Sequence, residues 1–289
     1  MTRWLGAGLL IAAAPLAQAQ RPDQIPAFRS AVDVVRLDVS VLRNGNPVRG
    51  LTAADFVVTD NGVQQVVDSV VVDQLPLSVQ LVLDASGSVV GNRLTHLIAA
   101  ADGLVAALRP GESAGLLIFS HRLRPIAPIT NDLGSVRGGL AAITGEGLTA
   151  LRDAVQFALS ADHAAGARPL TLVFTDGVDT ASWLSDEEVL ESARRAGTVI
   201  HAVSVGSRQI SPTRFVERLV ETAAGRLWSA RSESDLARLF TSALDEMRAR
   251  YLLSFAAQRP VRPGWHELRV RLKNRGADIT ARPGYFVAQ

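Results

Sequence analysis

Hydrophobic positions follow two different periods along this chain. In residues 32–42, valines and leucines alternate with Arg36, Asp38 and Ser40, and a period of two predicts a strand with one buried face. Further apolar stretches at 56–58 and 63–72 are separated by turn residues. Residues 32–76 are therefore expected to form an antiparallel β unit, which is too small to be stable by itself.

From residue 77 the pattern changes to continuous apolar runs that alternate with amphipathic segments. The apolar runs are residues 79–83, 114–119, 170–174 and 199–205. Helical spacing is found in residues 92–108, 150–159, 185–196, 213–223 and 232–250. This alternation predicts a doubly wound, mainly parallel α/β sheet over residues 77–250, covered by helices on both faces. Ser232 is expected to cap the last helix, with Arg248 and Arg250 favourable at its C-terminal end.

Beyond residue 250 the chain returns to short alternating stretches. They cover residues 251–255, 266–272 and 279–281, with turn residues between them. Two β segments that flank a complete α/β domain both need somewhere to bury their apolar faces. We therefore expect residues 251–289 to complete one small β domain with residues 32–76, so that the α/β domain is inserted between its halves.

The first residues have the pattern of a secretory signal peptide. A basic start at Arg3 is followed by an apolar run over residues 4–16 and a small-x-small sequence that ends at Ala19. The run is shorter than the ~20 apolar residues that a spanning helix needs. Residues 1–19 are thus predicted to be removed, leaving a linker at residues 20–31. The mature chain is expected to lack an integral membrane segment and to be periplasmic or extracellular.

Composition argues against a nucleic-acid-binding protein and excludes a protein that depends on cysteine for disulfides or lipid attachment. The net charge is only +2, and the sequence pI of about 9.6 reflects arginine, because Lys273 is the only lysine. No basic stripe interleaved with aromatic residues is present, which argues against a nucleic-acid-binding protein. The chain has no cysteine, so neither a disulfide framework nor a lipid-modified cysteine is possible.

Candidate chemistry follows two of the predicted strands. Asp84, Ser86 and Ser88 come directly after the run at 79–83, and Asp176 follows the run at 170–174. Ligands of open α/β sheets gather at the carboxyl ends of strands. Two carboxylates with hydroxyls form a hard oxygen set that suits Mg²⁺, Mn²⁺ or Ca²⁺ rather than zinc or copper. Because hydroxyl ligands are neutral, the metal would keep positive charge that attracts an external carboxylate.

The sequence Asp84-x-Ser86-x-Ser88 resembles the first loop of the metal-ion-dependent adhesion site (MIDAS) of von Willebrand factor A (VWA) domains. The resemblance implies that Thr149 contributes from a second loop and Asp176 from a third, which completes the five metal ligands in family order. It also implies that Mg²⁺ is the favoured ion and that a protein partner offers an Asp or Glu to the metal, as in cell adhesion.

The resemblance extends over residues 77–250. The flanks resemble a bacterial group of secreted VWA-related proteins, in which a segment similar to residues 48–56 precedes the domain and a sequence similar to Gly284-Tyr285 follows it.

Each motif taken alone also has an ordinary structural interpretation. Asp and Ser are common loop residues that bond their own backbone. Thr149 could cap the helix predicted at 150–159. Asp179 is expected to be a solvated loop acid, and Asp153 to lie in a first helical turn, where a carboxylate is favourable. It is the conjunction of three motifs at three element ends that favours the metal site.

Enzyme classes fit the sequence less well. Ser86 is not in a Gly-x-Ser-x-Gly sequence. The glycines at 145 and 147 resemble a dinucleotide fingerprint, but the residues before them have helical rather than strand spacing. The five histidines form no ligand-spaced cluster, and His201 is expected to be a satisfied core or edge residue rather than a base. We therefore predict a binding protein, not an enzyme. The alternative is a structural protein of the cell envelope in which the metal only stabilises loops.

Overall fold

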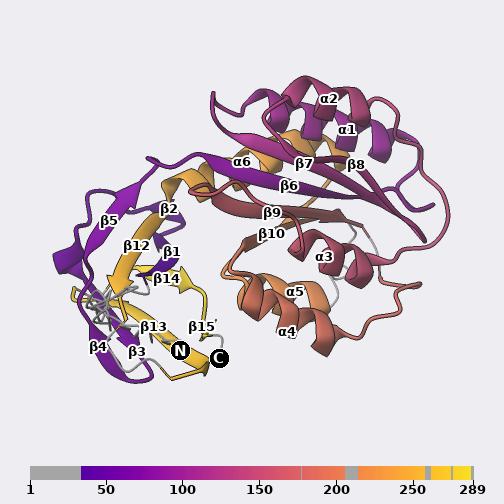
Figure 1. Cartoon of the computed structure of the whole chain (residues 1–289). Helices are drawn as coiled ribbons and strands as arrows, with labels where there is room; N and C mark the ends of the chain where they lie inside the picture. Colours follow the sequence, from indigo (N-terminus) through magenta and orange to yellow (C-terminus); the bar gives the residue numbers. More distant parts are fainter. Residues whose placement is uncertain (1–33, 177, 206–213, 258–261, 275, 288–289) are drawn as a thin grey trace, which may run out of the picture. The chain divides into compact units, whose positions relative to one another are not determined.

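The computed structural model describes residues 34–176, 178–205, 214–257, 262–274 and 276–287. The predicted signal peptide at 1–19 and linker at 20–31 lie outside these ranges. A six-stranded sheet has helices on both faces, and two smaller antiparallel sheets come from the N-terminal and C-terminal regions (Figure 1). Within the described ranges, no helix is long and apolar enough to span a membrane.

The six-stranded sheet is mainly parallel, as the apolar runs predict. Only β8 (Leu123–Thr130) runs antiparallel, against β7 (Ser113–Phe119) at one edge. The order across the sheet is β11 (Leu227–Ala230), β10 (Val199–Val205), β9 (Arg168–Thr175), β6 (Leu77–Asp84), β7 (Ser113–Phe119) and β8 (Leu123–Thr130). The predicted doubly wound α/β fold is thus confirmed.

Two hydrophobic cores cover the two faces of this sheet (Figure 1). One face carries α1 (Asn92–Ala106), α2 (Leu133–Leu140) and α6 (Leu236–Ala249). The other carries α3 (Leu151–Leu159), α4 (Asp186–Ala196) and α5 (Arg214–Thr222). Successive residues of β6 alternate between the cores, with Leu81 and Leu83 in the first and Val82 in the second. A strand that is buried on both faces is expected to be mainly apolar, which explains the nearly continuous apolar run of β6.

The ends of the last helix differ from the prediction. Ser232 caps a short 3₁₀ turn, η2 (Glu233–Asp235), through a capping box with Asp235, and α6 begins after it. Arg250 does not serve the exposed end of the helix, because its side chain is only 1% exposed. Its Nε donates to both oxygens of Glu246, at 3.0 and 2.9 Å. The arginine therefore belongs to a buried ion pair at the point where α6 passes into the next strand.

The N-terminal and C-terminal segments of the described chain meet in one β unit, as expected. β1 (Val34–Arg43) pairs antiparallel with β12 (Tyr251–Ala256), so that Leu37 lies opposite Leu253. Both sheets of this unit enclose a third hydrophobic core. The remaining elements are β2 (Asn46–Pro47), η1 (Ala53–Asp55), β3 (Phe56–Asp60), β4 (Val63–Gln65), β5 (Ser69–Val72), β13 (Gly264–Leu272), β14 (Asp278–Ala281) and β15 (Gly284–Val287).

A histidine with two acceptors lies in the β unit. His266 Nδ1 is 2.8 Å from Asp60 Oδ1, and its Nε2 is 2.7 Å from the carbonyl oxygen of Arg262. Tyr285 donates its hydroxyl to the other oxygen of Asp60 at 2.7 Å. Burial lowers the pKa of His266, but the Arg262 carbonyl and Asp60 act more strongly, so that the pKa lies above its usual value. Both ring nitrogens donate only in the charged imidazolium form.

The charged form of His266 predicts a pH dependence of stability. Because its pKa is raised on folding, its contribution is complete below the unfolded pKa of about 6.5 and is lost as the pH rises through the folded pKa. Thermal unfolding of the wild type and of His266→Gln, measured from about pH 5 to pH 9, isolates this contribution as their difference. The difference is expected to shrink as the pH rises. A constant difference would mean that the pKa of His266 does not change on folding, and a difference that grows with pH would mean that folding lowers it.

Candidate metal centre

Sheet register brings the two predicted loops with carboxylates together. β6 and β9 are adjacent and parallel, with Leu83 opposite Phe174. Asp84, the last residue of β6, and Asp176, directly after β9, therefore emerge at the same edge of the sheet. This is the edge at which ligands of open α/β sheets are expected.

Asp84 is a desolvated carboxylate. The side chain is fully buried; its Oδ1 accepts from the backbone N–H of Ser86 at 2.9 Å, and its Oδ2 accepts from the Thr175 hydroxyl at 2.9 Å. Burial raises the pKa of Asp84 to about 6, against the effect of these hydrogen bonds, and the negative charge of Asp176 adds to the rise. A carboxylate in this environment is stabilised by any cation that reaches it.

A series of hydrogen bonds connects the two carboxylates, and it begins at the backbone N–H of Ser86, which donates to Asp84. Ser86 Oγ lies 3.1 Å from Ser88 Oγ, and Ser88 Oγ donates to Asp176 Oδ1 at 2.8 Å. Ser86 and Asp176 are both buried. Four of the five predicted ligands, Asp84, Ser86, Ser88 and Asp176, thus lie in one hydrogen-bonded series across the edge of the sheet.

The second loop, with Thr149, lies against the first. The backbone N–H of Gly87 donates to the carbonyl of Gly147 at 2.9 Å, and that of Glu146 donates to the carbonyl of Ala85 at 2.8 Å. Gly147 has a φ of +74°, and an added Cβ would lie 2.0 Å from Nδ1 of His121, so only glycine fits there. Thr149 itself is buried at 5% exposure.

Thr149 is not a helix cap. The N-cap position of α3 is Ala150, which has no side-chain capping bond. The backbone of Thr149 instead joins the third loop: its N–H donates to the Thr180 hydroxyl at 3.1 Å, and its carbonyl accepts from the N–H of Thr180 at 2.8 Å. The three loops therefore support one another, and the side chain of Thr149 is not used for capping.

As a set, these side chains suit a hard divalent cation. No group of three or more His, Cys, Asp or Glu side chains among the described residues could hold a metal ion. A metal at this edge would therefore depend on hydroxyl oxygens beside the carboxylates of Asp84 and Asp176. An all-oxygen set of two carboxylates and three hydroxyls is the chemistry that Mg²⁺ and its relatives take.

Arg93 is the residue at this site that sequence reasoning missed. It lies in the first turn of α1, and its Nη1 forms an ion pair with Asp176 Oδ2 and donates to the Ser88 carbonyl at 3.2 Å. Its Nε also lies 3.4 Å from Glu233 Oε1 in η2. The guanidinium is thus a positive charge that already compensates one of the predicted metal ligands.

Removing this charge is expected to tighten metal binding. Two unit charges 4 Å apart repel by about 4 kcal/mol at an effective dielectric constant of 20. Arg93 is partly exposed and has Glu233 as a second partner, so only a fraction of this repulsion should act on a bound cation. We therefore expect Arg93→Gln to bind the cation more tightly by a factor on the order of ten.

Titration of Mn²⁺ by electron paramagnetic resonance measures this gain. Arg137→Gln is the matched control, because it removes the same charge from an exposed pair with Asp102. Unchanged or weaker Mn²⁺ binding in Arg93→Gln would mean that Arg93 does not compete with the cation.

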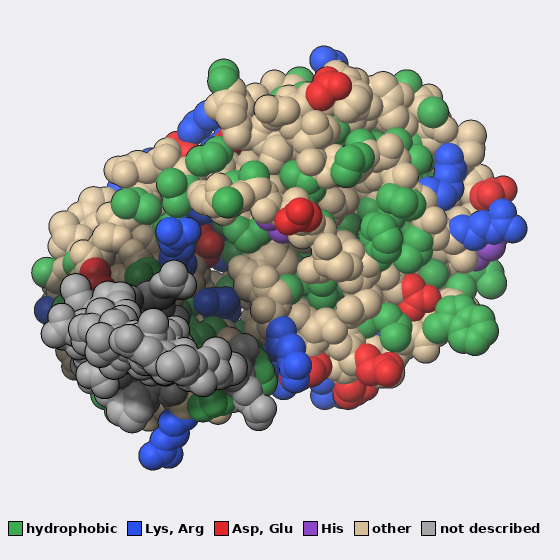
Figure 2. Space-filling model, in the orientation of Figure 1, with side chains coloured by type: hydrophobic (Ala, Val, Ile, Leu, Met, Phe, Trp, Pro, Cys, Tyr) green, Lys and Arg blue, Asp and Glu red, His purple; other side chains and the backbone are tan. Residues whose placement is uncertain are grey.

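Other candidate chemistry does not converge on this edge. His201 is fully buried; its Nδ1 accepts from the N–H of Arg226 at 3.0 Å, and its Nε2 lies 2.8 Å from Glu246 Oε2. It is thus a core residue, with Nδ1 hydrogen-bonded and Nε2 beside a carboxylate, and it lies outside the candidate metal centre. The residues before the glycines at 145 and 147 form α2, where a dinucleotide fingerprint needs a strand. On the face drawn in Figure 2, Lys and Arg side chains are scattered among acidic and apolar ones.

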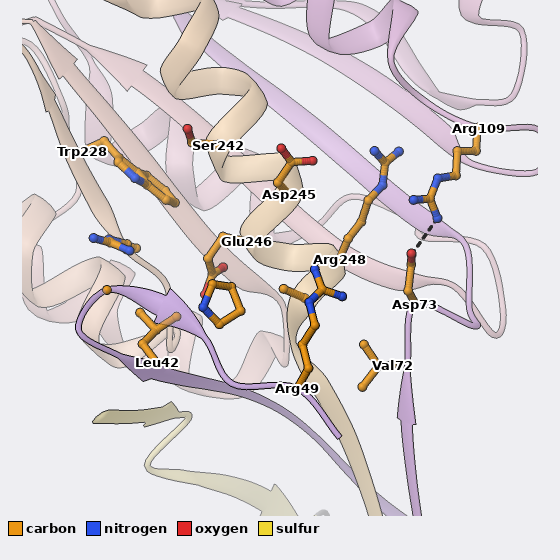
Figure 3. Close-up of a pocket in the computed structure, with 14 residues that line it drawn as sticks. Leu42, Arg49, Val72, Asp73, Arg109, Trp228, Ser242, Asp245, Glu246 and Arg248 are labelled. Atoms are coloured by element: carbon orange, nitrogen blue, oxygen red, sulfur yellow. Dashed lines mark hydrogen bonds and ion pairs between the residues drawn. The ribbon is translucent and has the colours of Figure 1, made fainter. Parts of the chain in front are cut away.

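A cavity of about 610 Å³ lies away from the three loops (Figure 3). Arg49, Arg109 and Arg248 extend into it beside acidic residues. Two of these arginines have counter-charges at hand: Arg109 pairs with Asp73 at 2.7 Å, and Arg248 pairs with Glu112 at 2.8 Å. None of the residues that line this cavity belongs to the candidate metal centre.

Fold and site together define an α/β domain with a potential cation site at the carboxyl edge of its sheet. A family model of the von Willebrand factor type A domain matches residues 78–241. The chain belongs to this family. No curated protein sequence matches it.

Solved structures support the same fold at low sequence identity. Proximal thread matrix protein 1 from the mussel byssus, solved with zinc in its MIDAS motif, is 18% identical with a TM-score of 0.56, over 66% of this chain and 50% of that protein. A von Willebrand factor type A protein from Catenulispora acidiphila is 11% identical with a TM-score of 0.54, over 91% of this chain and 76% of that one. BatB from Bacteroides thetaiotaomicron is 18% identical with a TM-score of 0.50, over 59% of this chain and 98% of that one.

Proposed function

We propose that this protein is an exported, cation-dependent binding module for another protein. Asp84, Ser86, Ser88, Thr149 and Asp176 would hold Mg²⁺, and an Asp or Glu of the partner would complete the coordination of the metal. Mn²⁺ and Ca²⁺ are alternative ions for the same oxygen set.

The observation that carries this proposal is the hydrogen-bonded series that links the two carboxylates through the backbone N–H of Ser86 and the hydroxyls of Ser86 and Ser88. Three neutral hydroxyls among the ligands leave positive charge on a bound cation, and such a cation is the largest local charge in its site. This charge attracts an external carboxylate. The mussel protein with zinc in its MIDAS motif supports the view that this type of site takes a divalent ion.

Export and domain layout are part of the proposal. The pattern at residues 1–19 supports a cleaved signal peptide. We further propose that residues 32–76 and 251–289 form one small β domain around a VWA domain at 77–250. N-terminal sequencing of the mature protein from periplasmic and culture fractions would test export, with a start at Gln20 as the expected result.

The second candidate function is structural: the metal would only fasten the three loops of an envelope protein. The contacts between the three loops favour this function, because a metal bound among adjacent loops could be held wholly by this chain. The two functions differ in where the metal acts. In the first it contacts the partner, and in the second it contacts only this chain.

A pull-down from envelope and culture extracts separates the two. The full chain should capture a partner in Mg²⁺ and release it in EDTA, while its far-ultraviolet circular dichroism stays unchanged. Asp84→Asn should capture nothing. Thr149→Ala should weaken capture of the partner more than it weakens metal binding. Capture that persists in EDTA and in Asp84→Asn would leave only the structural function.

A further inference from the structure

Exposed apolar side chains gather on the loops of the candidate metal centre. Val90 follows the first loop, Leu148 precedes Thr149 in the second, and Val178 and Trp183 follow Asp176 in the third. All four are more than half exposed, and Trp183 is 96% exposed, the highest value among the large apolar side chains described. We call these four residues the apolar collar. Single exposed apolar residues are ordinary, but a group around one site indicates an interaction surface.

Direct contacts hold the loops of the collar side by side. An added Cβ on Gly145 in the second loop would meet Cγ1 of Val90 at 2.9 Å. The carbonyl of Thr149, next to Leu148, accepts from the N–H groups of Thr180 and Ala181 at 2.8 and 3.0 Å. The collar therefore borders the same edge of the sheet as the candidate metal ligands.

The segment that presents Trp183 is anchored through its backbone. Its N–H donates to both oxygens of Asp153, at 3.2 and 3.0 Å, and the N–H of Leu184 donates to Oδ1 of Asp153 at 3.0 Å. Asp179 accepts from the N–H and the hydroxyl of Ser182, at 3.0 and 2.5 Å.

Asp179 also accepts hydrogen bonds from Arg152 in α3. The backbone N–H of Arg152 donates to it at 2.8 Å, and the guanidinium of Arg152 pairs with it at 3.1 Å. Asp179 is thus not the solvated loop acid that the sequence predicted, since its side chain is only 9% exposed. Two buried or partly buried carboxylates fix the backbone on both sides of an indole that is itself free in solvent.

Exposure of the apolar indole to water is unfavourable, and a partner that covers an indole on an ordered backbone gains this free energy at a small entropic cost. Its backbone is already ordered, so association loses little conformational entropy there. Tryptophan is also the residue most often found as a hot spot in protein interfaces.

We infer that the apolar collar, with Trp183 as its main anchor, selects a partner segment in which the acidic residue is flanked by aliphatic or aromatic residues. This inference rests on the proposed function, because the acidic residue would contact the cation while its neighbours pack on the collar. The charge of the cation favours an acidic partner, and the collar, which is continuous with the metal loops, favours apolar neighbours.

Three synthetic peptides test the inference with the full chain. The first is Phe-Leu-Asp-Leu-Phe, the second is Ser-Asn-Asp-Asn-Ser, and the third is Phe-Leu-Asn-Leu-Phe, each with a fluorescent label. Their affinities are measured by fluorescence anisotropy in Mg²⁺ and in EDTA. We expect the first peptide to bind at least about tenfold more tightly than the second, and the third to bind weakly.

Variants assign this preference to the collar. Trp183→Ser should bind the first peptide no better than the second. Trp183→Phe should keep most of the preference, because it retains an aromatic side chain. Val66→Ser is the matched control, because Val66 is 72% exposed in the β unit and outside the three loops; it should behave as the wild type does.

The outcomes separate this inference from the proposed function. Equal, Mg²⁺-dependent binding of both Asp peptides would overturn the role of the collar and leave the cation-dependent function standing. A preference that persists in Trp183→Ser would likewise overturn the role of Trp183. Binding that ignores both EDTA and the Asp-to-Asn change, or no binding of any peptide, would overturn both.

Discussion

Replacing Asp84 with Asn is expected to abolish the stabilisation of this protein by divalent cations. An ion that binds only the folded loops stabilises the protein by about 2.7 kcal/mol when its free concentration is 100 times its dissociation constant. Asp84 is buried at the end of β6 and is hydrogen-bonded on both oxygens. The amide of Asn keeps one acceptor and the shape, so the fold should persist while the charge that holds the metal is lost.

Thermal unfolding in Mg²⁺, Mn²⁺ and Ca²⁺, each against EDTA, measures this effect. In EDTA the variant should be at least as stable as the wild type, because it removes a buried charge. Asp102→Asn is the matched control, since Asp102 is a partly exposed acid that pairs with Arg137 on the protein surface. Wild-type protein whose melting temperature responds to none of the three ions would argue against a metal centre.

Replacing Arg250 with Met is expected to destabilise the fold strongly, whether or not a metal is bound. The guanidinium is 1% exposed, pairs with Glu246 and donates to the carbonyl of Ala224 at 2.6 Å. Burial raises the pKa of Glu246, but Arg250 and His201 outweigh this effect and hold the pKa well below its usual value. Without Arg250 a buried carboxylate loses its principal counter-charge, a change that typically costs about 3–5 kcal/mol.

Chemical denaturation of Arg250→Met gives this cost directly. The double variant Arg250→Met with Glu246→Leu removes both charges and should recover much of the loss, because a buried pair replaced by apolar residues is often nearly neutral. The shift caused by Mg²⁺ should be unchanged in both variants, since Arg250 lies outside the three loops. A loss below about 1 kcal/mol in the single variant would mean that water reaches Glu246.

Elements with a strong hydrophobic period were predictable from the sequence. β6, β9 and β10 are buried on both faces and therefore consist mainly of apolar residues. The meeting of β1 with β12 could also be foreseen, because each flanking segment needed a partner for its apolar face. Asp84 and Asp176 could be placed at one edge because the ends of parallel strands share an edge.

Two strands of the six-stranded sheet escaped prediction for physical reasons. β8 lies at the edge of the sheet and contains Pro125 and Pro128, which interrupt the usual strand signal. β11 is four residues long and only partly buried. Short edge strands are defined by their pairing with a neighbour more than by their own pattern.

Side-chain partners that are distant in sequence were also unpredictable. Arg93 lies 83 residues from Asp176, and no local pattern indicates that the two meet. Asp153 and Asp179 were assigned ordinary roles, whereas they hold the segment that presents Trp183. Each of these contacts depends on how the loops pack in space, which a period in the sequence does not encode.

Crystals of the protein grown with Mn²⁺, measured at the manganese absorption edge, test most directly whether the five oxygen-bearing residues hold a divalent cation. We expect one anomalous peak among the side-chain oxygens of Asp84, Ser86, Ser88, Thr149 and Asp176, with Arg93 turned from Asp176 towards Glu233. No anomalous peak at saturating Mn²⁺, or a peak bound only elsewhere on the chain, would contradict the proposed metal centre.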